Sequence, residues 1–164
     1  MESKRERTLR DYFEASPLDI SSFRPIMTSL NGDNSWLLSF PSPLAEQSLV
    51  GKVYYHIVFE PWLNCPTGYL NSWFIHIQQL TISAVADAHS VDAVARRIES
   101  LARAALGAAL SIGEDPECEQ SHPIIDAILL GFHYPDHVHE ATLRLFDGNI
   151  PVFATPEAIA IIKP

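Results

Sequence analysis

The chain has 164 residues, of which 47% are apolar, so it can bury the core of one domain but not of two ordinary ones. Its 11 Lys and Arg residues face 20 Asp and Glu residues, and the net charge of −9 argues against a nucleic-acid-binding surface, which needs clustered cations. No apolar run approaches the roughly 18–20 residues of a membrane-spanning helix, and the charged N-terminus lacks the apolar stretch of a signal peptide, so we expect a soluble cytoplasmic protein without a membrane partner.

The first part of the chain is dominated by charge. Residues 1–16 carry few apolar side chains among their charged ones, which predicts a solvated helix or a frayed, peripheral end. We therefore assign residues 1–30 to a charged N-terminal extension and residues 31–164 to the folded domain. The first strands are predicted at 35–40 and 52–59, where β-branched and aromatic side chains are dense and a proline follows each run.

The second half of the chain alternates helix and strand signals. An amphipathic helix of about 20 residues is predicted from Ser90, its expected N-cap, because apolar residues then repeat at spacings of three and four. Residues 124–130 are almost wholly apolar, which predicts a strand covered on both faces. A short helix near 140–146, a small strand at 151–154 and a helix at 155–163 are expected to follow.

Histidines gather just after the apolar strand. His133, His137 and His139 lie within seven residues of one another, together with Asp136 and Glu140. Loops beyond the carboxyl ends of strands are the usual ligand sites of α/β proteins. Imidazole and carboxylate groups are accepted by Zn²⁺, Fe²⁺ and Mn²⁺. The cluster therefore indicates a metal site, and the alternative is a set of surface histidines that cap backbone groups.

Four segments together resemble the N-terminal half of a metallo-β-lactamase superfamily protein, and most of all its metal-dependent hydrolase-like branch. They are NSWLLSFP at 34–41, EPWL at 60–63, IIDAILLGFHYPDHVHEATL at 124–143 and IPVFATPEA at 150–158. The resemblance implies an α/β fold, an αββα sandwich with a dinuclear metal site. Only the first half of that sandwich is expected here, as a mixed sheet with flanking helices.

The family supplies its first metal ligands from a turn of pattern His-x-His-x-Asp-His. Asp136 and His137 match the Asp-His pair, whereas the two earlier histidine positions are Phe132 and Tyr134. The resemblance implies Zn²⁺, or Fe²⁺ or Mn²⁺ in its place, with Asp136 as the catalytic residue. The implied metal ligands are Asp136, His137, His133 and His139, and the implied supporting residues around them are Glu60 and Tyr134.

Two functions remain open at this point. The first is a metal-dependent hydrolase with an incomplete metal site, in which metal-bound hydroxide attacks an ester, amide, thioester or phosphate of a small-molecule substrate. The second is a non-catalytic relative that acts as a binding or interaction module. Because the family takes its remaining ligands from a C-terminal half that follows these segments, we expect the isolated chain to be inactive.

The same resemblance bears on assembly. Half of a sandwich would expose part of the face between its two sheets, and such a surface aggregates or pairs unless it is covered. Three explanations stay open: a truncated product of a longer gene, a compact domain closed over the missing half, and a protomer that completes itself by association. The last predicts a homo-oligomer that covers the exposed sheet.

Overall fold

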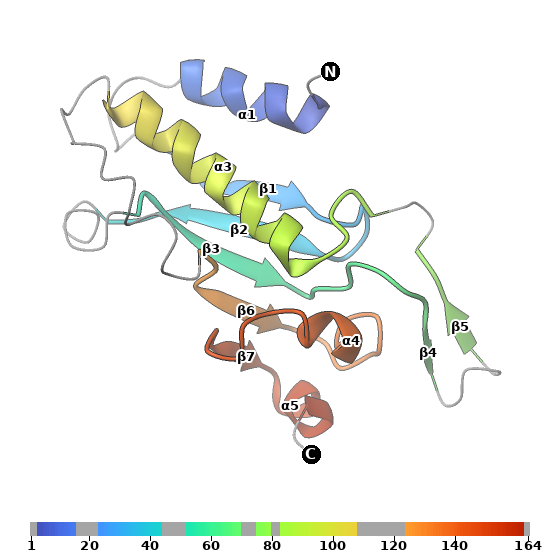
Figure 1. The fold of residues 1–164 in the computed structure, drawn as a ribbon. Helices are drawn as coiled ribbons and strands as arrows, with labels where there is room; N and C mark the ends of the chain where they lie inside the picture. Colours follow the sequence, from blue (N-terminus) through green and yellow to red (C-terminus); the bar gives the residue numbers. More distant parts are fainter. Residues whose placement is uncertain are drawn as a thin grey trace.

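The computed structural model describes residues 3–15, 23–43, 52–69, 75–79, 83–107 and 124–162 (Figure 1). Together they form an α/β fold with a mixed sheet and flanking helices, as predicted. The helices are α1 (Lys4–Ala15), α3 (Ala88–Gly107), α4 (Glu140–Leu143) and α5 (Pro156–Ile162). The strands are β1 (Ile26–Ser29), β2 (Trp36–Pro41), β3 (Tyr54–Phe59), β4 (Thr67–Tyr69), β5 (Ile75–Ile77), β6 (Ala127–Leu130) and β7 (Val152–Ala154).

The main sheet has five strands in the order β1-β2-β3-β6-β7. The pairs β1–β2 and β2–β3 are antiparallel, whereas β3–β6 and β6–β7 are parallel. The carboxyl ends of β3, β6 and β7 therefore lie at one edge of the sheet. The strands β4 and β5 form a separate antiparallel pair.

Both predicted early strands are present, but β1 and the β4–β5 pair were not expected. The strand β1 lies inside residues 1–30, which were assigned to a charged extension, and it pairs with β2 from Ile26 to Ser29. It is only four residues long, and its sequence Ile-Met-Thr-Ser does not alternate apolar and polar side chains, so the strand gives little signal. The prediction that residues 124–130 form a strand covered on both faces is also corrected, because Leu129 of β6 is 36% exposed.

The helix α3 packs against one face of the sheet, and α1 packs alongside α3 (Figure 1). The α3 residues in the buried core are Val91, Ala95, Ile98, Ala102 and Leu106. The sheet residues that meet this core are Leu37, Tyr54, Val58, Ile128 and Leu130. None of the described helices is long and apolar enough to cross a membrane.

The helix α1 is part of the core rather than peripheral, which corrects the expectation for the N-terminal segment. Leu9 and Phe13, four residues apart on one side of the helix, are both buried. The Phe13 ring makes edge-to-face contacts with Phe23 and Tyr54, at centroid distances of 5.5 and 6.2 Å. The many charges of the segment concealed this narrow apolar stripe.

The start of α3 also differs from the prediction. The helix begins at Ala88, and Asp87 rather than Ser90 caps it, because the Asp87 Oδ1 atom accepts a hydrogen bond of 2.7 Å from the Ser90 backbone N–H. Hydrogen bonding to Ser90 lowers the pKa of Asp87 below its ordinary value. Ser90 therefore lies within the first turn of the helix as a donor.

Candidate functional site

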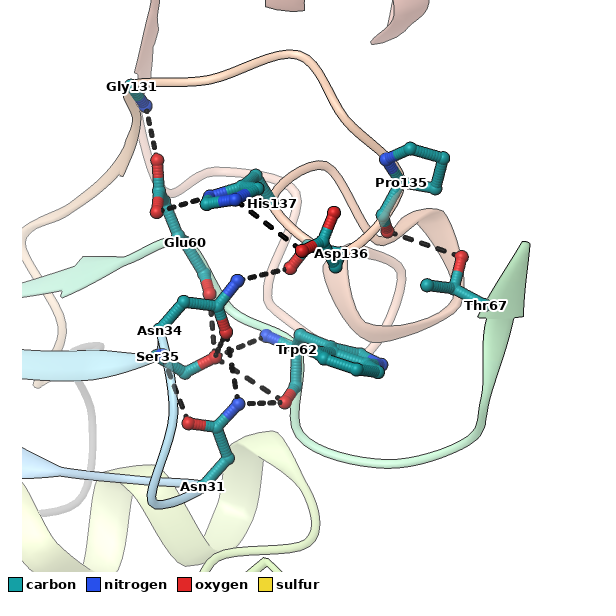
Figure 2. Close-up of polar contacts among 10 residues, drawn as sticks. All are labelled: Asn31, Asn34, Ser35, Glu60, Trp62, Thr67, Gly131, Pro135, Asp136 and His137. Carbon is teal, nitrogen blue, oxygen red and sulfur yellow. Dashed lines mark hydrogen bonds and ion pairs between the residues drawn. The ribbon is translucent and has the colours of Figure 1, made fainter. Parts of the chain in front are cut away.

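Three segments converge where β3 and β6 end (Figure 2). Glu60 directly follows β3, and the loop 131–137 follows β6. The turn 31–35 between β1 and β2 reaches the same place, because the Asn34 side chain donates a hydrogen bond of 2.6 Å to the Asp136 backbone carbonyl. The carboxyl edge of the parallel strands thus carries the candidate site, which is the common location in α/β folds.

Glu60 is the buried anchor of this site, with 4% of its surface exposed. Its Oε2 atom lies 2.6 Å from His137 Nδ1, and its Oε1 atom accepts a hydrogen bond of 3.2 Å from the Gly131 backbone N–H. Its φ of 48° lies in the left-handed region. For a residue other than glycine that conformation costs about 1–3 kcal/mol, and such strain gathers at functional sites.

The contact with Glu60 fixes the orientation of the His137 ring. The tautomer that fits this contact has the hydrogen on His137 Nδ1, which then donates a hydrogen bond to Glu60 Oε2, because a carboxylate oxygen accepts. In this tautomer His137 Nε2 holds a lone pair, and it lies 3.5 Å from Asp136 Oδ2. Histidines that bind metals usually donate the N–H of one ring nitrogen to a carboxylate and bind the metal with the other nitrogen. His137 has this arrangement, and Asp136 lies beside the nitrogen that would bind the metal.

The turn before β2 and the segment after β3 are locked together by buried polar groups. Ser35 Oγ donates to the Glu60 carbonyl at 2.7 Å and accepts from the Trp62 backbone N–H at 2.7 Å. Asn31 Nδ2 donates to the Trp62 carbonyl at 2.9 Å. Asn31, Asn34 and Ser35 were not predicted as site residues. The only available signal was their place in or beside the 34–41 segment of the resemblance.

In the loop after β6, His133 is half-buried and Tyr134 is exposed. Tyr134 and Phe132 are both more than 40% exposed, and the His133 ring contacts the rings of these two neighbours at 4.8 and 5.1 Å. The Phe132 ring also meets the His137 ring edge-on at 5.2 Å. An aromatic ring thus contacts His137 from a position where the family pattern has a histidine.

His139 is buried and caps α4. Its Nδ1 atom accepts a hydrogen bond of 3.3 Å from the Thr142 backbone N–H and lies 2.8 Å from Thr142 Oγ1. Burial lowers the pKa of His139 below its ordinary value. This histidine therefore caps a backbone group, as the alternative interpretation of the cluster expected, but it is buried rather than at the surface.

The described residues do not provide a complete catalytic metal site. Across them, no group of three or more His, Cys, Asp and Glu side chains is placed to hold a metal ion. Asp136 and His137 offer two donors, whereas Glu60 is bound to the opposite nitrogen of the His137 ring. A catalytic Zn²⁺ takes about three protein ligands and keeps one position open.

A second titratable cluster lies under α3, away from this edge. His56 Nδ1 is 2.9 Å from Ser39 Oγ, and His56 Nε2 is 3.4 Å from Glu99 Oε1. The sequence of contacts from Ser39 through His56 to Glu99 resembles the triad of a serine hydrolase. Ser39 and His56 are fully buried and Glu99 is 3% exposed, so no substrate reaches the Ser39 hydroxyl. Glu99 accepts the backbone N–H groups of Val53 and Tyr54, at 3.0 and 2.6 Å, which makes the cluster a structural clamp on β3.

In comparisons with known proteins, no family model, no curated protein and no solved structure matches the chain.

Proposed function

We propose that this protein is a non-catalytic relative of the metallo-β-lactamase superfamily that works as a binding or interaction module. The observation that carries the proposal is the environment of His137. One ring nitrogen is held by buried Glu60, and the ring is contacted by Phe132 at a position where a catalytic member has a histidine. Tyr134 replaces the second histidine of that pattern.

The two further histidines near the pair support the same proposal. His139 uses its Nδ1 atom to cap α4, and His133 contacts the rings of Phe132 and Tyr134. Asp136 and His137 are then left as two donors, fewer than catalysis by Zn²⁺ requires. A mixed sheet with flanking helices is what we expect of the first half of the family fold, and in it the Asp-His pair follows β6 and Glu60 follows β3.

The second candidate function is a metal-dependent hydrolase, and one observation favours it. The 3.5 Å approach of Asp136 Oδ2 to His137 Nε2, with Glu60 on the other side of the ring, is an oriented pair of donors. A metal bound there would act as a Lewis acid and activate water. The pair would need a further ligand from outside the described residues or from another subunit.

Metal content separates the two candidates. The chain is purified without a metal-affinity tag, equilibrated with Zn²⁺, Fe²⁺ or Mn²⁺, dialysed, and assayed by inductively coupled plasma mass spectrometry. The same is done for the double variant Asp136→Asn, His137→Asn. His133→Asn, in the same loop, is the matched control, because it removes an imidazole without touching the pair.

The proposal expects wild type, double variant and control to retain equally little metal after dialysis. About one or more metal ions per chain in the wild type and in His133→Asn, lost in the double variant, would overturn it in favour of the hydrolase.

A further inference from the structure

The two faces of the main sheet differ sharply in their surroundings. Along β2 and β3, alternate residues such as Leu37, Tyr54 and Val58 are fully buried under α3. The residues between them point to the opposite face, since neighbours along a strand alternate sides. That second face, called here the open face, carries these larger apolar side chains: Met27, Trp36, Leu38, Phe40, Ile57, Phe59, Leu129 and Phe153.

None of these eight side chains is part of the buried core. Met27 is 66% exposed, Phe153 60%, Phe40 42% and Leu129 36%. The strand register places them in rows that cross the sheet, so that Trp36, Phe59, Leu129 and Phe153 stand side by side from β2 to β7. Exposed apolar residues are common singly, but a continuous sheet face of them marks an interaction surface.

The composition of the open face indicates which kind of surface can bind to it. No described strand position on it holds a charged residue, although the chain as a whole has a net charge of −9. A charged partner surface would lose its hydration there without gaining an ion pair. The surface that fits is therefore another apolar, slightly twisted sheet face, packed at about 10 Å.

The exposed area of the open face is large enough for a dimer of two copies of the chain. We take roughly 200 Å² for each large side chain. The four exposed residues then present roughly 400 Å², and the four half-buried ones add roughly 200 Å², which gives roughly 600 Å² per copy. Two copies packed face to face would bury roughly 1,200 Å², which is the lower end for stable specific complexes. A two-fold axis lets the same patch serve both partners.

We propose that the open face is a homodimer interface, in which two copies stack their sheets through Met27, Phe40, Leu129 and Phe153. The inference rests on the proposed function, because it names the partner of the binding module. The two can fail separately, since metal retention is measured on variants of Asp136 and His137, whereas assembly is measured on variants of the open face.

The test is the mass of the intact chain in solution, by light scattering after gel filtration and by sedimentation velocity, from micromolar concentration upward. Met27→Lys and Phe153→Lys each place a charge on the open face at a side chain that is already more than half exposed. Ile161→Lys is the matched control, because Ile161 is 55% exposed and belongs to α5 rather than to a strand of this face. Circular dichroism checks that every variant stays folded.

The wild type and Ile161→Lys are expected to have twice the chain mass, and the two open-face variants the mass of one chain. A wild type that is monomeric throughout would overturn the inference and leave the open face to a different occupant. Dimeric open-face variants would also overturn it, as would dissociation of Ile161→Lys.

Discussion

At the scale of single residues, Glu60 is the best-defined member of the candidate site. Its carboxylate binds a side chain from one loop and a backbone N–H at the end of β6, and its backbone is held at a positive φ. Burial of a polar group costs free energy unless hydrogen bonds replace those that it made with water. Glu60 therefore both positions His137 and joins β3 to the loop after β6.

Replacement of Glu60 by alanine is expected to lower the free energy of unfolding by about 2 kcal/mol, because His137 Nδ1 and the Gly131 N–H lose their acceptor. Glu140→Ala is the control, since the Glu140 carboxylate lies in an exposed ion pair with Arg144, and its loss should change stability by less than about 0.5 kcal/mol. Urea unfolding measures both. Equal stability of the two variants would contradict the anchoring role of Glu60.

The buried Glu99 gives the chain a specific acid sensitivity. Burial by itself would raise the pKa of Glu99, but the contact with His56 and the hydrogen bonds from Val53 and Tyr54 outweigh it and lower the pKa below the ordinary 4.5. A lowered folded-state pKa contributes stability that is complete above the unfolded value and is lost as pH falls through the folded value.

The stability difference between wild type and Glu99→Gln should therefore be larger at pH 6 than well below pH 4.5, where both side chains are uncharged. Urea unfolding across this range, with Glu140→Gln as the exposed control, provides the measurement. A difference that stays constant or grows on acidification would refute the assignment.

At the scale of elements, α1 is the least expected contributor to the core. It reaches the sheet through a cluster of rings, in which Phe13 contacts Phe23 and Tyr54, while Arg5 Nη2 donates to the Ser29 carbonyl of β1 at 2.8 Å. Burial of the Arg5 side chain lowers its pKa from the ordinary value. The N-terminal helix thus secures both α3 and the edge strand β1.

Phe13→Ala is expected to destabilise the protein by about 3–4 kcal/mol, because it removes a buried ring and leaves a cavity between α1 and the sheet. Leu145→Ala, at a side chain that is 47% exposed, should cost far less. Thermal unfolding of the two variants gives the comparison. A loss for Phe13→Ala no greater than that for Leu145→Ala would mean that α1 does not support the core.

Periodicity located the long elements but not the contacts between distant segments. The helix α3 and the strands β2, β3 and β6 follow from apolar spacing, since their side chains face a core directly. The approach of Glu60 to His137 joins residues 77 apart and depends on the parallel pairing of β3 with β6, which no local pattern encodes. A short helix was predicted near 140–146, but apolar spacing does not fix the first residue of a helix, so the sequence could not show that His139 is the N-cap of α4 rather than a ligand.

At the scale of the whole molecule, the two faces of the sheet differ in burial. The helix α3, with α1 alongside it, covers one face of the sheet (Figure 1), the open face carries apolar side chains, and the candidate site lies where β3 and β6 end. In the proposed account this edge keeps an oriented Asp-His pair without the ligands for catalysis. Binding through the open face is then the property on which function depends.

The most direct test of the proposed lack of catalysis is hydrolysis by the intact chain with Zn²⁺, Fe²⁺ or Mn²⁺ in excess. Chromogenic ester, thioester, phosphodiester and β-lactam substrates are compared for the wild type and for Asp136→Asn, His137→Asn. The account predicts that the two proteins give the same background rate on every substrate. Metal-dependent turnover by the wild type that disappears in the double variant would contradict it.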